Sequence, residues 1–160
     1  MSRAKYLISA QKLEELQAEL HKLVTEGRKD ISERFKSLQT QTVEELDDPF
    51  AEVSDDKFYL EKRVAEIEDI LKNHEIIHDD PNFPGVEIGS FVRVGFEGFE
   101  DNYEIVDPVE ADPLQKKISC ESPVGKALLG KFVGETVEVN IGGISKKFRV
   151  LEIKSQPNDN

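Results

Sequence analysis

Apolar residues in the first 73 positions recur every three or four residues, which predicts two amphipathic helices. The first helix is expected to run from an N-cap at Ser9 to about Glu44, a length of ~50 Å at 1.5 Å per residue. The second is expected to start with Asp48 as N-cap and Pro49 as its first residue, and only Lys57 interrupts its apolar stripe. Two stripes joined by a short polar connection predict an antiparallel helical hairpin, that is, a coiled coil. The stripes consist of Leu13, Leu16, Leu20, Leu23, Val24, Ile31, Phe35 and Leu38, and of Phe50, Val53, Leu60, Val64, Ile67 and Leu71.

The second half of the chain alternates between β-type runs and turn residues, which predicts a small α+β domain of about five strands and one helix. The helix is expected between the third and fourth strands, with Ser122 as N-cap, Pro123 as its first residue and Gly130 just past its end. The pair Gly142-Gly143 predicts a tight hairpin turn. The five expected strands are 91–96, 103–106, 117–120, 136–141 and 147–151.

A change of composition near residue 80 divides the chain. Pro81 and Pro84 end any helix there, so residues 79–85 are expected to form a linker. The predicted organisation is a coiled-coil arm over 1–78, a globular domain over 86–154 and a frayed tail over 155–160.

Composition and charge exclude several classes of protein. The chain has 160 residues, of which 38% are hydrophobic and 34% charged, with 33 acidic and 21 basic side chains and a net charge of −12. This net charge argues against non-specific nucleic-acid binding unless the basic residues are segregated. The sequence contains no apolar run of the ~20 residues that cross a membrane, so no membrane partner is expected. The single cysteine, Cys120, cannot form an internal disulfide and is expected in the core of a cytoplasmic protein.

The charges are unevenly distributed along the predicted hairpin. Residues 44–56 contain seven acids and no base, and they include the connection between the helices. One interpretation is an ordinary solvated turn, and the other is a set of carboxylates offered to Mg²⁺ whose remaining ligands come from a partner. The middle of the first helix is mildly basic by contrast. The acids are Glu44, Glu45, Asp47, Asp48, Glu52, Asp55 and Asp56, and the bases are Lys22, Arg28, Lys29, Arg34 and Lys36.

Residues 118–131, followed by 134–139, resemble the carboxy-terminal signature of the bacterial transcript-cleavage factors GreA and GreB. Residues 86–90, 110–112, 19–20 and 28–31 are also similar to positions of this family. The resemblance implies a coiled-coil arm and an FKBP-like domain in a monomeric factor that docks at the secondary channel of RNA polymerase. In the family, tip carboxylates help to hold an Mg²⁺ ion of the polymerase site, so that the polymerase hydrolyses backtracked RNA.

The resemblance also implies roles for particular residues. The factor would be an accessory protein with no cofactor of its own, sharing Mg²⁺ with the polymerase. The family's docking positions correspond to the turn of Glu121, Ser122 and Pro123. The basic residues Arg28, Lys29, Arg34 and Lys36 would face nascent RNA or the channel wall.

The tip departs from the family pattern, which reads Asp-Leu-x-Glu-Asn-Ala-Glu-Tyr. In this chain residues 44–53 read Glu-Glu-Leu-Asp-Asp-Pro-Phe-Ala-Glu-Val. Neither an ungapped alignment anchored on the second helix nor one shifted by three residues places the two key carboxylates of the family on acidic residues. On charge and position alone, Asp47 and Asp48 are the expected metal ligands, with Glu44 and Glu45 as substitutes.

Three functions therefore remain open. The chain is a Gre-type factor whose altered tip assists cleavage, or a secondary-channel binder that inhibits or modulates the polymerase without cleavage. The third alternative, from another class, is a peptidyl-prolyl isomerase or chaperone-like module. It is disfavoured because prolyl pockets are usually lined by aromatic side chains, whereas the second half has no Trp, one Tyr and phenylalanines that are expected to be core residues. These are Phe83, Phe91, Phe96, Phe99, Phe132 and Phe148.

Overall fold

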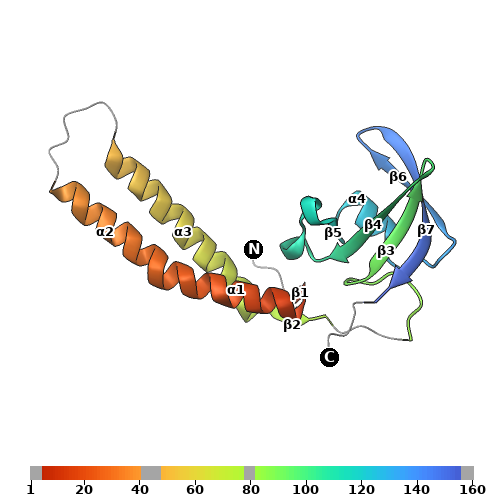
Figure 1. The fold of residues 1–160 in the computed structure, drawn as a ribbon, viewed down its shortest axis with the longest axis horizontal. Helices are drawn as coiled ribbons and strands as arrows, with labels where there is room; N and C mark the ends of the chain where they lie inside the picture. The colour runs from red at the N-terminus through yellow and green to blue at the C-terminus, as the bar shows by residue number, and fades with distance from the viewer. Residues whose placement is uncertain (1–4, 41–47, 78–81, 156–160) are drawn as a thin grey trace. The chain divides into compact units, whose positions relative to one another are not determined.

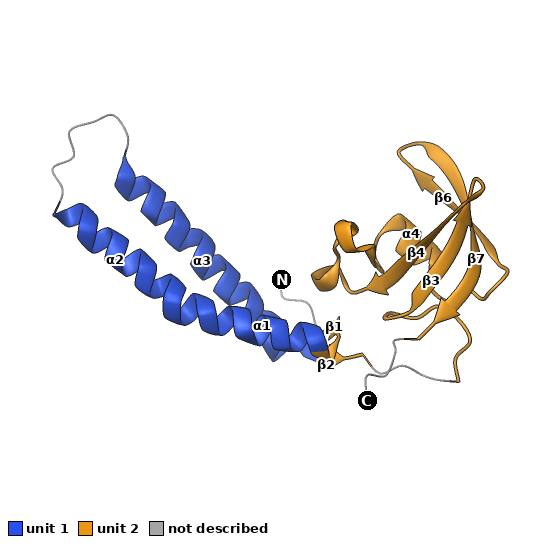
Figure 2. Ribbon diagram, viewed as in Figure 1, with its two compact units in different colours: residues 1–5, 11–74 blue, residues 6–10, 75–160 orange. Residues whose placement is uncertain are grey.

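The computed structural model describes residues 5–40, 48–77 and 82–155. The chain divides into two compact units, shown in two colours in Figure 2. One contains residues 11–74 together with the amino terminus up to residue 5, and the other contains 6–10 and everything from 75 onward.

The first unit is the predicted antiparallel helical hairpin (Figure 1). Its outgoing helix runs without a break from Ala10 to Gln39, and a π-helical segment over Leu23–Gly27 lies between α1 (Ala10–Lys22) and α2 (Arg28–Gln39). The returning helix is α3 (Pro49–Lys72). The predicted end of the first helix at Glu44 is therefore wrong within the described residues, since α2 ends at Gln39, and residues 41–47 lie outside them.

Five residues of the two predicted stripes are buried in the hairpin together with Ile70, whereas Val24 and Phe50 of these stripes are exposed. Gly27 lies at the end of the π-helical segment, where a β-carbon would stand only 2.6 Å from Leu60 Cδ1. Glycine thus permits a close approach of the two helices at this point. The buried residues of the hairpin are Leu16, Ile31, Val53, Val64, Ile67 and Ile70.

The second unit is built on a five-stranded sheet with the order β5-β4-β3-β7-β6. All neighbours are antiparallel except β4 and β5, which are parallel. The predicted α+β class is confirmed, and each expected strand exists, although β4 and β7 are longer than predicted. The strands are β3 (Phe91–Phe96), β4 (Phe99–Val106), β5 (Lys117–Ser119), β6 (Thr136–Ile141) and β7 (Ile144–Lys154), and the helix is α4 (Pro123–Leu128).

Alternate residues of the strands form the core of this unit. Val92 and Val94 on β3 pack with Val150 on β7, Leu128 on α4 and Cys120, which is buried as predicted.

Most of the phenylalanines do not enter this core, so that prediction is wrong. Phe148 is buried and Phe96 packs against the core, but the other four are at least about a third exposed. Side chains alternate between the faces of a strand, so burial of Val92 and Val94 places Phe91 on the opposite face. The four exposed rings are Phe83, Phe91, Phe99 and Phe132.

Two short strands were missed by sequence reasoning, namely β1 (Tyr6–Ile8) and β2 (His74–Ile76), which form a sheet of their own. The buried carboxylate of Asp107 accepts a hydrogen bond from the Leu7 amide at 3.1 Å. The buried Glu110 accepts from the Ser9 amide at 3.0 Å and from its hydroxyl at 2.8 Å. Ser9 immediately precedes α1 as predicted, and its hydroxyl makes this distant contact.

Candidate functional site

The acidic connection between the helices is described only at its last residue. Glu44, Glu45 and Asp47 lie outside the described residues, while Asp48 is exposed and is the N-cap of α3 as predicted. Its Oδ1 accepts hydrogen bonds from the amides of Phe50 at 3.1 Å and Ala51 at 3.2 Å. This cap satisfies two amides at the helix start and leaves Oδ2 as the oxygen that could face a ligand.

No metal site is preformed in the part of the chain that the structure describes, where no three His, Cys, Asp or Glu side chains are grouped to hold an ion. The proposed ligation by Asp47 and Asp48 stays a prediction. With Oδ1 occupied by the cap, Asp48 suits a single bond to a metal whose other ligands come from elsewhere.

Most of the basic side chains expected to contact RNA are paired within the hairpin. The Arg28 guanidinium donates two hydrogen bonds of 2.9 Å to the Glu61 carboxylate, and these lower the pKa of Glu61. Arg34 forms an ion pair with Asp56 at 2.8 Å, which raises the pKa of Arg34.

Of the four basic residues expected to contact RNA, the two lysines differ in their distance to a carboxylate. Lys29 lies 4.0 Å from Glu33, at the limit of an ion pair. Among the described residues, Lys36 has no carboxylate within 4 Å. It is therefore the predicted contact most available to an external anion.

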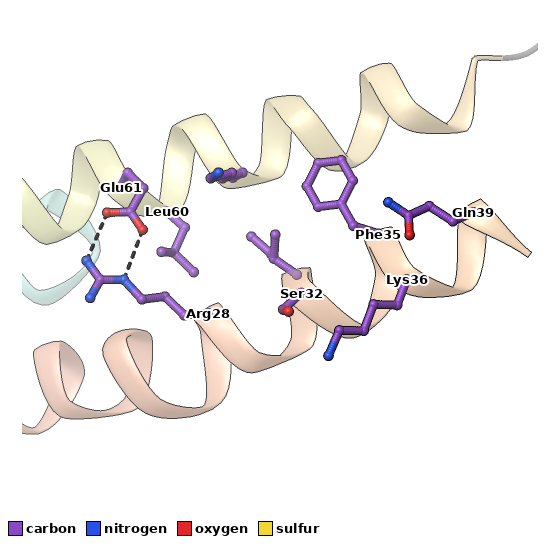
Figure 3. A pocket seen from close by; sticks show the side chains of 9 residues that line it. Arg28, Ser32, Phe35, Lys36, Gln39, Leu60 and Glu61 are labelled. Carbon is purple, nitrogen blue, oxygen red and sulfur yellow. Dashed lines mark hydrogen bonds and ion pairs between the residues drawn. The ribbon is translucent and has the colours of Figure 1, made fainter.

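Lys36 lines a groove of about 380 Å³ between α2 and α3 (Figure 3). The Phe35 ring lies between the helices, and the Arg28–Glu61 pair closes one end. Lys57 lines the groove from α3 and also has no carboxylate within 4 Å in the described chain. The complete lining is Arg28, Ile31, Ser32, Phe35, Lys36, Gln39, Lys57, Leu60 and Glu61.

The groove carries three cations against one carboxylate, although the chain as a whole is strongly acidic. Lys57 was missed as a candidate, and the available signal was its place as the one interruption of the apolar stripe of α3. A cation next to an aromatic floor can bind a phosphate while its neighbours contact a base or sugar.

The predicted docking turn on the second unit is held by its own hydrogen bonds. The Ser122 hydroxyl donates to the Ser119 carbonyl at 2.7 Å and accepts from the Gly125 amide at 3.1 Å, as an N-cap of α4. The Glu121 amide donates to Ser119 Oγ at 3.0 Å. Glu121 and Pro123 are exposed, so the turn presents a charge and a rigid apolar ring side by side. Their role in docking stays a prediction.

Comparisons with known proteins agree over nearly the whole chain. The family described as transcription elongation factor, GreA/GreB, C-terminal, matches residues 81–155. Transcription elongation factor GreA of Clostridium acetobutylicum is 39% identical over 154 residues, which are 94% of this chain and 97% of that protein. Its counterpart from Acetivibrio thermocellus is 39% identical over 145 residues, or 89% of this chain and 91% of that protein.

A solved structure is also similar. The GreA factor homolog 1 of Thermus thermophilus is 26% identical, with 96% of this chain and 99% of that chain covered, at a TM-score of 0.41. No helix in the described residues is long and apolar enough to span a membrane. The extent and identity of the GreA matches confirm the resemblance seen in the sequence: the chain belongs to the GreA/GreB family of transcription elongation factors.

Proposed function

We propose that this protein binds bacterial RNA polymerase at its secondary channel and stimulates cleavage of backtracked nascent RNA. It would act in the cytoplasm as a monomeric accessory factor, with the polymerase performing the hydrolysis. The observation that carries the proposal is a helical hairpin of a GreA-family chain whose connection is rich in carboxylates and ends in the capped Asp48.

The proposed role of the acidic tip is to supply ligands to a metal ion. Asp47 and Asp48 would complete the coordination of an Mg²⁺ ion in the polymerase site, with Glu44 and Glu45 as substitutes. That ion supplies charge stabilisation of the attacking and leaving oxygens during hydrolysis. The cap supports this role for Asp48, because the two hydrogen bonds that backbone amides donate to Oδ1 restrict the rotation of the carboxylate.

The groove supports a contact with RNA. Lys36 and Lys57 would approach phosphates, and Phe35 would offer a surface for a base. Arg28 and Arg34 would contribute mainly to the hairpin, because a carboxylate already neutralises each of them. Docking on the polymerase would use Glu121, Ser122 and Pro123 on the exposed turn.

The test uses stalled, backtracked transcription complexes with Mg²⁺ and measures shortening of the transcript. The key variant is Asp47→Asn/Asp48→Asn, because asparagine is as good an N-cap as aspartate but offers no carboxylate. We expect cleavage to fall by at least about tenfold, with the helical circular dichroism signal unchanged. Glu14→Gln, an exposed change far from the tip in the sequence, is the matched control and should stimulate cleavage by the polymerase as the wild type does.

Each outcome separates the hypotheses. If the double variant stimulates cleavage as fully as the wild type does, Asp47 and Asp48 are not metal ligands. If the wild type binds and slows elongation without shortening transcripts, the chain is an inhibitory channel binder. Absence of binding to the polymerase would overturn the proposal as a whole.

The hypothesis of a peptidyl-prolyl isomerase is tested by a separate assay of prolyl-peptide isomerisation. Four of the six phenylalanines are exposed and so do not count against a prolyl pocket, but membership of a transcription elongation factor family disfavours this hypothesis. Acceleration of prolyl-peptide isomerisation by the intact chain would restore it.

A further inference from the structure

Two large aromatic side chains are exposed next to each other on α3. Phe58 is 64% exposed and Tyr59 is 66% exposed. Their rings meet edge to face, with centroids 5.7 Å apart and planes inclined by 72°. Edge-to-face packing is a favoured arrangement of aromatic rings, so the two rings form one joint surface.

This surface does not belong to the hairpin packing. Leu60, two residues on, lines the groove against α2. At about 100° per residue, Phe58 lies almost on the opposite side of α3 from Leu60. Exposure of two neighbouring aromatic side chains to water is unfavourable, and such patches commonly mark sites of interaction.

The charges around the pair indicate what kind of partner fits. Asp55 lies one turn before Phe58, and Lys62 lies one turn after it. Both are exposed, and neither makes an ion pair within 4 Å in the described chain. An apolar centre with a polar rim of both signs is typical of protein–protein interfaces. Nucleic-acid interfaces are strongly positive, so one lysine opposed by one aspartate disfavours RNA here.

We propose that Phe58 and Tyr59 form a protein-docking surface of the hairpin, occupied by an apolar cleft of the polymerase with a charged rim. The proposal rests on the proposed function for the identity of the partner. Tyrosine supports it further, because a partly buried ring can keep its hydroxyl in contact with water or a polar rim group. This surface consists of residues other than those assigned to the acidic tip, the groove and the turn at Glu121 to Pro123, and it would add affinity without taking part in cleavage.

The test compares two double variants in the full chain. Phe58→Ala/Tyr59→Ala removes both rings, while the exchange Phe58→Tyr/Tyr59→Phe keeps two exposed rings at the same positions. We expect the dissociation constant for immobilised core polymerase to rise at least about tenfold for the alanine variant. The exchange variant should stay within about twofold, because the apolar area is retained. Thermal unfolding of both should match the wild type, since both positions are exposed.

The cleavage assay adds a second measurement. Saturating concentrations of the alanine variant should restore transcript shortening, whereas saturation with the Asp47→Asn/Asp48→Asn variant should not.

If the wild type binds the polymerase and the alanine variant binds it with the same affinity, this inference is overturned and the proposed function still stands. Loss of binding to a single-stranded RNA oligonucleotide would overturn it in favour of a nucleic-acid surface. Loss of self-association in sedimentation would overturn it in favour of a second copy of the chain, and a wild type that does not bind polymerase would overturn both proposals.

Discussion

Gly125 on α4 is a position where only a residue without a side chain fits. A β-carbon at this position would lie 2.0 Å from the carbonyl oxygen of Ser119 and 2.9 Å from its carbonyl carbon. The same carbonyl accepts hydrogen bonds from the Ser122 amide and hydroxyl. The glycine therefore allows α4 to lie directly on the turn that carries Glu121 and Pro123.

At the residue scale, we expect Gly125→Ala to destabilise the protein by more than about 2 kcal/mol, because backbone must move to admit the methyl group. Urea unfolding followed by circular dichroism measures this. Lys126→Ala, an exposed change on the same helix, should stay within about 0.5 kcal/mol of the wild type. Equal stability of the two variants would show that the close contact with Ser119 does not constrain this position.

At the element scale, the hairpin is connected by ion pairs as well as by its apolar stripes. Arg63 on α3 donates hydrogen bonds of 2.7 and 2.9 Å to Glu19 on α1. Arg28 and Arg34 on α2 pair with Glu61 and Asp56 on α3. The pairs follow the length of the hairpin and stabilise one register of the two helices, although each is partly exposed and contributes modestly.

The Arg63–Glu19 pair predicts a pH dependence of the hairpin. The hydrogen bonds from Arg63 lower the pKa of Glu19 below its usual value of 4.5. A carboxylate with a lowered pKa in the folded state adds stability above its unfolded pKa and loses it as pH falls through the folded value. We expect the helical thermal midpoint to fall on acidification below about pH 4.5, and Glu19→Gln to weaken that fall.

Circular dichroism at 222 nm between pH 3 and 6 measures this effect as a difference between variants. Glu14→Gln on the same helix is the control, since Glu14 is exposed and has no ion pair within 4 Å in the described chain. If Glu19→Gln shows the full acid dependence of the wild type, the pair does not contribute to the stability of the hairpin.

At the scale of the whole molecule, the two units are not two successive stretches of the sequence. Residues 6–10 belong to the unit that contains the sheet, although they precede the entire hairpin in the sequence. Asp107 is 0% and Glu110 7% exposed, and amides of the amino-terminal segment supply hydrogen bonds to both carboxylates. Buried carboxylates without such donors are costly, so this segment stabilises residues of its own unit that lie 100 positions further along the sequence.

Deletion of residues 1–9 should therefore destabilise the second unit, by about 1–3 kcal/mol for each carboxylate that loses its donors. Hydrogen exchange measured by mass spectrometry should show faster exchange in β4 and β5 of the deleted chain. Ser9→Ala removes only the hydroxyl bond to Glu110 and should have a smaller effect in the same segments. Exchange in β4 and β5 that matches the wild type would contradict a stabilising role for the amino-terminal segment.

The sequence by itself determined the features that depend on neighbours a few residues away. The hairpin, the Asp48 cap before Pro49, the Ser122 cap before Pro123 and the existence of all five strands follow from periodicity and local hydrogen bonds. The family resemblance rests on such local runs as well, and the comparisons confirm it.

Only the tertiary structure decided which distant residues meet. It set the strand order β5-β4-β3-β7-β6, the parallel pairing of β4 with β5 and the inclusion of β1 in the second unit. It also paired Arg28 with Glu61 and thereby left Lys36 and Lys57 as the cations available in the groove. It left Phe58 and Tyr59 exposed on the outer side of α3. These outcomes depend on contacts between segments far apart in the chain, whose partners no local pattern of residues specifies.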